Sequence, residues 1–194
     1  MPSDTRDRIL TATAELFRAR GYHGTSLKQV TAVSGAPIGS VYHFFPGGKV
    51  ELAEAVLVST GASYRALFEL IADAAPDPVA AVTDFFEGAA VVLEETGYLD
   101  ACPIGTVALE VASSDERLRR ATDAVFASWA EAAVDRLTAA GLDPAAAGEL
   151  ATTLIAGIEG GFMLSRAAHS PEPMHAVGRT MCRLVEAALA GVRV

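Results

Sequence analysis

The chain has 194 residues, of which 51% are hydrophobic and 20% are charged, so it has enough apolar material to form a core. This composition excludes a disordered chain, and the two cysteines, Cys102 and Cys182, exclude a disulfide framework. The sequence contains no run of 18 or more apolar residues, so it predicts no transmembrane helix. The first residues lack the pattern of a signal peptide. We therefore expect a globular, cytoplasmic protein with no membrane partner.

Charge is unevenly distributed along the chain. The formal net charge is −9, which argues against a large nucleic-acid-binding surface. The first 50 residues nevertheless carry six basic and three acidic residues, whereas the other 144 carry nine arginines and 21 acidic residues. A basic N-terminal segment on an acidic body predicts that only this segment contacts a polyanion. Chance clustering is the alternative, because the basic excess is small.

Helical signals begin at the N-terminus. Over residues 4–20 the apolar side chains recur on one helical face, and Gly21 is a typical helix stop. Ser26 and Gln29 have the spacing of a capping box, which predicts a short helix that ends at Ser34-Gly35.

A third short helix is expected at about 38–45, because Ala36-Pro37 is a break that places a proline near a helix start. Pro46-Gly47-Gly48 separates it from a longer helix that begins near Lys49. The apolar pattern of that helix loosens around Ser59-Thr60-Gly61, where we expect a bend.

The remaining sequence also predicts helices and no strands. The expected segments run from Asp77-Pro78 to Gly97, over 106–113, from Ser114-Asp115 to about Ala140, from Asp143-Pro144 to about His169, and over 174–191. The fold class is therefore predicted to be all-α, with about nine helices.

The three short N-terminal helices, with a tight turn before the third, match the helix–turn–helix pattern. Val41 and Phe45 lie four residues apart and should anchor the third helix to the first two. Polar and aromatic groups lie off that face, where they can reach base edges and phosphates: Ser40, Tyr42 and His43. Lys49 adds a cation for the DNA backbone. We therefore predict a DNA-binding domain over residues 1–48 and a second helical domain over residues 49–194.

Four motifs occur in order in this region: a Leu-Phe pair at 16–17, G-Y-x-G-T-S at 21–26, S-V-Y-H-F-F at 40–45 and P-G-G-K at 46–49. With them, the segment from Ile9 to Lys49 resembles the N-terminal domain of TetR-family transcriptional regulators. ACPIGTVALE at 101–110 is similar to the LmrA/YxaF-like subgroup of that family. The resemblance implies a ligand-responsive regulator of transcription.

The resemblance also implies roles for individual residues. Ser40 and His43 would approach bases, while the residues that would hold phosphates are Tyr42, Lys49, and Thr25 or Ser26. Two positions depart from the family pattern: Ile38 stands where Lys or Arg is frequent, and Phe44 stands where His or Tyr is frequent. Both departures remove polar groups near DNA. They predict either weaker phosphate anchoring or a direct contact between Ile38 and a thymine methyl group.

Aromatic and soft apolar side chains are concentrated in the middle helices, where they form either a core or a pocket for an apolar ligand. The resemblance implies an effector site here, with Glu110 or Arg166 adding a charge. We predict a small hydrophobic or aromatic effector bound by Phe85, Phe86, Tyr98, Cys102, Leu109, Phe126, Trp129 and Phe162.

The last two helices are predicted to form a homodimer interface. One of these helices lacks side chains on part of its surface, because it contains Gly157, Gly160 and Gly161. On the other, an apolar stripe runs from Val177 to Leu189. A two-fold axis would place two recognition helices about 34–36 Å apart, which suits a near-palindromic operator. Repression relieved by the effector is the mode that the resemblance implies, and activation is the alternative.

Two other classes remain open on the sequence. One is an all-α carrier whose N-terminal domain has lost DNA affinity, which Ile38 and Phe44 would favour. The other is a small enzyme that uses Cys102 with a histidine, and it would lose activity on thiol alkylation. The acidic and histidine residues show neither a catalytic pair nor a metal-ligand spacing. We expect no enzyme activity, no metal and no cofactor.

Overall fold

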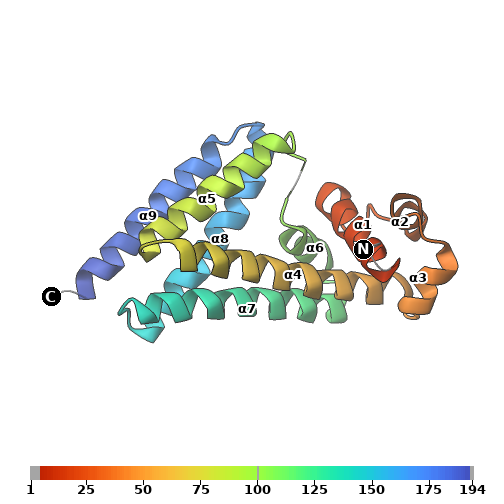
Figure 1. Cartoon of the computed structure of the whole chain (residues 1–194), viewed down its shortest axis with the longest axis horizontal. Helices are drawn as coiled ribbons and strands as arrows, with labels where there is room; N and C mark the ends of the chain where they lie inside the picture. Colours follow the sequence, from red (N-terminus) through yellow and green to blue (C-terminus); the bar gives the residue numbers. More distant parts are fainter. Residues whose placement is uncertain (1–4, 100, 193–194) are drawn as a thin grey trace. The chain divides into compact units, whose positions relative to one another are not determined.

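The computed structural model describes residues 5–99 and 101–192, and every regular element within these ranges is an α-helix (Figure 1). The helices are α1 (Thr5–Arg20), α2 (Leu27–Ser34), α3 (Ile38–Phe44), α4 (Gly48–Ala74), α5 (Pro78–Glu95), α6 (Pro103–Val111), α7 (Glu116–Ala139), α8 (Pro144–Ala168) and α9 (Glu172–Val192). These nine helices confirm the predicted all-α class for the described part of the chain.

Most helix ends follow the predicted local signals. The Ser26 hydroxyl accepts a hydrogen bond from the Gln29 amide, and the Gln29 side chain accepts one from the Ser26 amide, so the capping box is confirmed. Gly35 ends α2 in the left-handed conformation at φ 65°. The largest difference is in α6, predicted at 106–113, which spans Pro103–Val111 because Cys102 caps it and proline suits the first helical position. The last helix, α9, begins at Glu172 rather than at residue 174.

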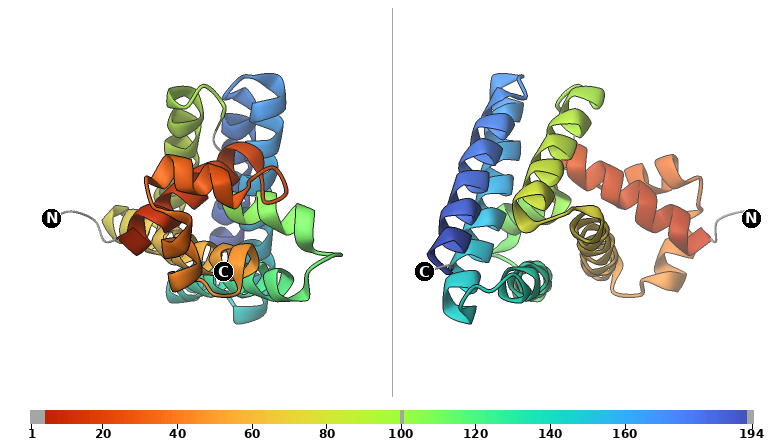
Figure 2. Two further views of the ribbon diagram at one scale, coloured as in Figure 1. Left: turned by 90° about the vertical axis from the view of Figure 1, so that its right-hand side faces the viewer. Right: turned by 60° about the vertical axis from the view of Figure 1, so that its left-hand side comes forward.

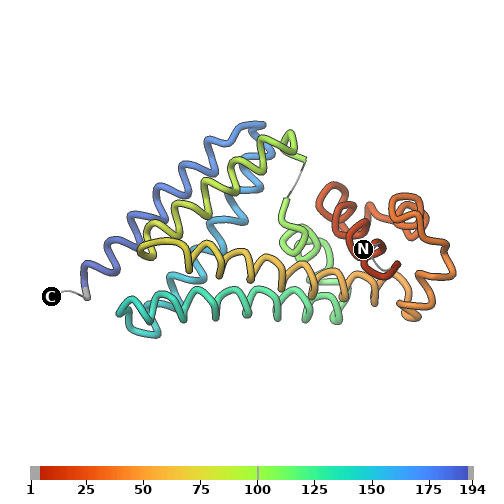
Figure 3. Tube along the Cα trace, viewed as in Figure 1, coloured from red at the N-terminus to blue at the C-terminus, as the bar shows by residue number. Residues whose placement is uncertain are grey.

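The helix α4 runs without interruption through residues 59–61, where the sequence suggested a bend (Figure 3). Gly61 has a packing role there: a Cβ atom at this position would lie 2.6 Å from Cγ1 of Val125 on α7. The glycine therefore allows the two helices to approach closely.

By its internal contacts the chain divides into two compact units, with three boundaries along the sequence. Two of them fall inside helices, α4 and α7, and the third lies just before α6. The first unit extends to Ala62 and also contains Cys102–Val125, so it holds α1, α2, α3, α6 and the first parts of α4 and α7. The second unit contains Ser63–Ala101 and the chain from Phe126 onward. A functional division after residue 48 is a separate prediction.

In the first unit the three short helices share a small core. Ile9 and Phe17 of α1 are fully buried, as are Val30 of α2 and Val41 of α3. Arg8 of α1 also donates a hydrogen bond to the carbonyl of Ser34, over 3.0 Å, at the end of α2. This bond satisfies a carbonyl that the helix itself leaves unpaired.

In the second unit α9 packs against both α5 and α8 (Figure 2). Phe86 of α5 and Met174 and Val185 of α9 belong to one buried apolar cluster. A Cβ atom added to Gly161 of α8 would lie 2.7 Å from the Met174 sulfur. Packing against α9 of the same chain therefore accounts for this glycine.

The other two α8 glycines of the predicted interface differ from each other. A Cβ atom at Gly157 would lie 3.2 Å from Cγ1 of Val177, so α9 approaches here too. At Gly160 a Cβ atom would meet no other atom within 4 Å. Contacts within the chain therefore leave Gly160 without a packing reason.

By length and composition, α4 is the one helix in the described ranges that passes as a candidate membrane span. It nevertheless forms ion pairs from several turns. Glu54 pairs with Arg117 and Asp73 pairs with Arg136, while Arg65 bonds to Glu69 at 2.9 Å. Charged residues are costly in a bilayer. The ion pairs of α4 are therefore typical of a helix that packs against other helices of a protein.

Candidate nucleic-acid interface

The helix α3 divides into a buried side and an exposed side. Pro37 precedes its first turn with extended backbone angles, and Phe45 ends it. Val41 is fully buried and Phe45 is 2% exposed, so both anchor the helix to the core of the first unit. On the other side Ile38 is 48% exposed and Tyr42 is 53% exposed. The buried side therefore anchors the helix, and its exposed side faces solvent.

The residues predicted to contact bases lie on or beside that exposed side. His43 is exposed, and its ring centroid lies 5.0 Å from that of Phe44. Ser40 is half-buried. A Cβ atom at Gly39 would meet nothing within 4 Å, so the surface around it is open.

At the start of α2 the two candidate phosphate ligands differ. Thr25 is 2% exposed, and its hydroxyl donates to the Gly21 carbonyl over 2.8 Å. Ser26 is exposed at the helix N-cap. Of the two hydroxyls, that of Ser26 is thus the one at the surface.

Lys49 lies at the start of α4 against an aromatic ring. Its Nζ is 4.2 Å from the ring centroid of Tyr22, which is a cation–π distance. Burial lowers the pKa of Lys49, and the carboxylate of Glu110 raises it by a smaller amount. Burial also raises the pKa of Tyr22, followed by repulsion from Asp115. The ammonium group is therefore held in place at the edge of the first unit.

Glu110 at the end of α6 is a residue whose role the sequence did not reveal. Its Oε2 accepts a hydrogen bond of 2.7 Å from the backbone amide of His23, in the turn between α1 and α2. A Cβ atom at Gly21 would lie 1.7 Å from the Glu110 Oε1, so a side chain there would displace this carboxylate from its present position. Glu110 thus ties α6 to the turn that precedes the predicted phosphate ligands. The partners are 87 residues apart, and no local motif marks such a contact.

The predicted effector residues are distributed over both units. In the first unit Cys102 is buried at the N-cap of α6, where its sulfur accepts a bond from the Gly105 amide, and Leu109 is 85% exposed. In the second unit Phe85, Phe86, Tyr98 and Phe162 belong to or pack against the buried apolar cluster. Phe126 and Trp129 stack edge to face, with ring centroids 5.5 Å apart.

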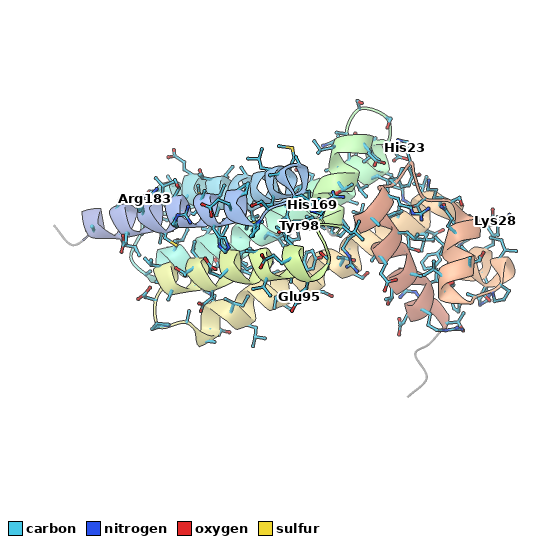
Figure 4. All side chains as sticks on the ribbon, turned by 90° about the horizontal axis from the view of Figure 1, so that it is seen from above. His23, Lys28, Glu95, Tyr98, His169 and Arg183 are labelled. Carbon is cyan, nitrogen blue, oxygen red and sulfur yellow. The ribbon has the colours of Figure 1, made fainter. Side chains whose placement is uncertain are left out.

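Tyr98, which follows α5, and His169, which ends α8, form a pair in the second unit (Figure 4). Their ring centroids are 4.7 Å apart, and Arg166 donates to the Tyr98 carbonyl over 3.2 Å. Both residues have positive φ, 61° and 53°, a conformation that costs energy for residues other than glycine. His175 of α9 bonds to Glu87 of α5 at 3.1 Å.

The first unit also contains an open groove of about 520 Å³. It is lined by Glu54, Val58, Glu116, Arg117, Arg120, Ala121 and Ala124, none of which was predicted to bind the effector. Over residues 5–99 and 101–192, no three His, Cys, Asp or Glu side chains group as a metal site.

Comparison with known proteins identifies the class. Residues 9–56 match the model of the bacterial regulatory proteins of the tetR family, and residues 78–180 match that of the C-terminal domain of LmrA/YxaF-like transcriptional regulators. The chain therefore belongs to the TetR family and is a DNA-binding regulator of transcription rather than an enzyme. Within that family, its C-terminal part is of the LmrA/YxaF-like type.

Individual proteins agree with this assignment. The chain is 39% identical to the regulator YxaF of Bacillus subtilis over 84% of its own length and 85% of that protein. It is 33% identical to LmrA of the same organism, over 88% and 91% of the two chains.

Solved structures share the fold. A TetR regulator from Legionella pneumophila superposes with a TM-score of 0.83 at 22% identity, covering 94% of this chain and 98% of that one. A cysteine mutant of the TetR-family regulator CifR, complexed with 26-bp operator DNA, gives a TM-score of 0.78 at 22% identity, covering 94% and 97%.

Proposed function

We propose that the protein is a cytoplasmic homodimeric repressor that binds a near-palindromic operator and is released by a small hydrophobic or aromatic molecule. The observation that carries the proposal is the division of α3. Val41 and Phe45 fix it from behind, while Tyr42 and His43 face solvent. A recognition helix needs a rigid support and an exposed polar front of this kind.

In this proposal Ser40 and His43 contact bases, and Tyr42, Ser26 and Lys49 contact phosphates. Thr25 acts through its hydrogen bond to Gly21, which supports the turn before Ser26. The acidic remainder of the chain repels DNA, which confines contact to the N-terminal helices. Binding is then strongly dependent on salt.

Exposed apolar side chains on α8 and α9 support the dimer. Met163 and Leu164 on α8 are 61% and 50% exposed, and Leu184 on α9 is 42% exposed. Gly160, with open space beside it, lies on α8 one turn before Leu164. Another helix could approach closely at this position, and a second copy of the chain would cover the exposed leucines.

Release requires that the effector bind better to a state in which the two recognition helices are wrongly spaced. A hundredfold preference corresponds to about 2.7 kcal/mol of coupling, which is within the usual allosteric range. The aromatic groups of the second unit are the proposed binding residues. Titration calorimetry of aromatic compounds into wild-type and Trp129→Ala proteins tests this placement, and equal affinities would refute it.

The experiment that tests the proposed function is selection of random duplex DNA by the purified protein at about 150 mM salt, near physiological screening. We expect one inverted repeat to be recovered, to be lost with Tyr42→Ala, and to be retained with Leu70→Ala. Leu70 is a suitable control because it is a large side chain that is 66% exposed on α4 in the second unit. A folded, dimeric protein that selects no motif would contradict the proposal.

A further inference from the structure

The side chains of α3 limit which bases it can recognise. Residues 38–44 read I-G-S-V-Y-H-F and contain no Arg, Lys, Asn, Gln, Asp or Glu. In the major groove, guanine is usually bound by Arg or Lys, adenine by Asn or Gln, and cytosine by Asp or Glu. Thymine differs from these because its 5-methyl group is recognised by apolar contact.

Ile38 is the aliphatic side chain that α3 offers for such a contact. It is 48% exposed, whereas Val41 is fully buried in the core. Tyr42 lies one turn further along the same side, and the surface around Gly39 between them is open. A β-branched side chain has few rotamers, so Ile38 loses little entropy when it packs against a base.

The polar groups on α3 distinguish the bases less clearly than a methyl contact does. The Ser40 hydroxyl can donate or accept, so it fits more than one base edge. The imidazole of His43 likewise changes its donors with its tautomer. A methyl contact by Ile38 would separate thymine from cytosine, which has no methyl group.

We infer that Ile38 is a specificity-determining residue that packs against the 5-methyl group of a thymine in each operator half-site. The inference rests on the proposed role of α3 as the recognition helix.

The test uses two random duplex pools, one made with thymidine and one with deoxyuridine, which pairs identically but lacks the methyl group. We expect the thymidine pool to yield an inverted repeat with a fixed thymine in each half. Replacing both thymines by deoxyuridine should weaken wild-type binding about sixteenfold. This is about fourfold per half-site, or about 0.8 kcal/mol for each methyl group.

Three variants assign this discrimination to its residue. Ile38→Ala should bind the thymidine and deoxyuridine duplexes equally, and Ile38→Val should keep most of the preference. Val58→Ala is the matched control, because Val58 is an aliphatic side chain on α4 that is 56% exposed. It should discriminate like the wild type. Because Ile38 and Val58 are both exposed, circular dichroism should show all variants folded.

The other possible outcomes distinguish failure of the inference from failure of the proposed function. If the wild type selects a motif but binds its deoxyuridine version equally well, the methyl contact is refuted and the proposed function stands. If Ile38→Ala keeps the full preference, the assignment to Ile38 is refuted. If neither pool yields a motif, the inference and the proposed function both fail.

Discussion

At the scale of single residues, Lys49 is a cation that the fold already positions for its proposed phosphate contact. Its ammonium lies over the Tyr22 ring, an arrangement worth about 0.5–1 kcal/mol at an exposed site. Burial lowers the pKa of Lys49, while the Glu110 carboxylate opposes this change. Because the ring contact orders the side chain in the free protein, the proposed phosphate contact would cost less entropy.

Removing the negative charge of Glu110 should lower the pKa of Lys49 further in Glu110→Gln, because burial then acts unopposed. Lys28 and Lys49 are the two lysines of the chain, so lysine-labelled protein gives two side-chain signals to follow by NMR titration. The signal of Lys28, which is exposed on α2, serves as the internal reference. An unchanged pKa of Lys49 would show that Glu110 does not act on it.

Residue-scale features were predictable where the partners are close in sequence. The Ser26–Gln29 capping box is one example, because both of its hydrogen bonds span three residues. The hydrogen bond that the His23 amide donates to Glu110 was not predictable from local patterns. It depends on how α6 packs against α1, and a single sequence carries no direct record of that packing.

At the scale of elements, the sequence predicted helix positions well because caps and stops are local signals. It predicted the meaning of helical glycines less well, since a glycine can weaken a helix or admit a neighbour. The sequence suggested a bend at Gly61 of α4 and gave no sign of its close approach to Val125 of α7. Gly88 of α5 has open space around it.

These two glycines predict opposite effects of alanine. Gly88→Ala should raise the free energy of unfolding by about 1 kcal/mol through helix propensity alone. Gly61→Ala gains the same stabilisation from helix propensity, but its Cβ would lie 2.6 Å from the valine at position 125, whose side chain has few rotamers. Overpacking costs about 1–3 kcal/mol and should make the variant less stable than wild type. Urea unfolding measures both variants, and a stabilised Gly61→Ala would mean that α4 and α7 can separate at no cost.

At the scale of the whole molecule, the proposed function depends on features that no single chain contains. A half-site of a few base pairs gives weak binding, so in the proposed dimer two recognition helices act together on one operator. The sequence could suggest the interface from the apolar stripe of its last helix. It could not separate side chains that pack within the chain, such as Met181 and Val185, from exposed ones such as Leu184.

The exposed leucine of α8 provides the test of this assembly. Leu164→Glu should place a carboxylate in the proposed interface and give a monomer in sedimentation at micromolar concentration, because an unpaired buried charge is costly. Operator affinity should then fall by at least about a hundredfold, since the second half-site no longer benefits from the first. Val91→Glu is the matched control: Val91 on α5 is 50% exposed, as Leu164 is, and should remain dimeric. A dimer that survives Leu164→Glu would require an interface elsewhere on the chain.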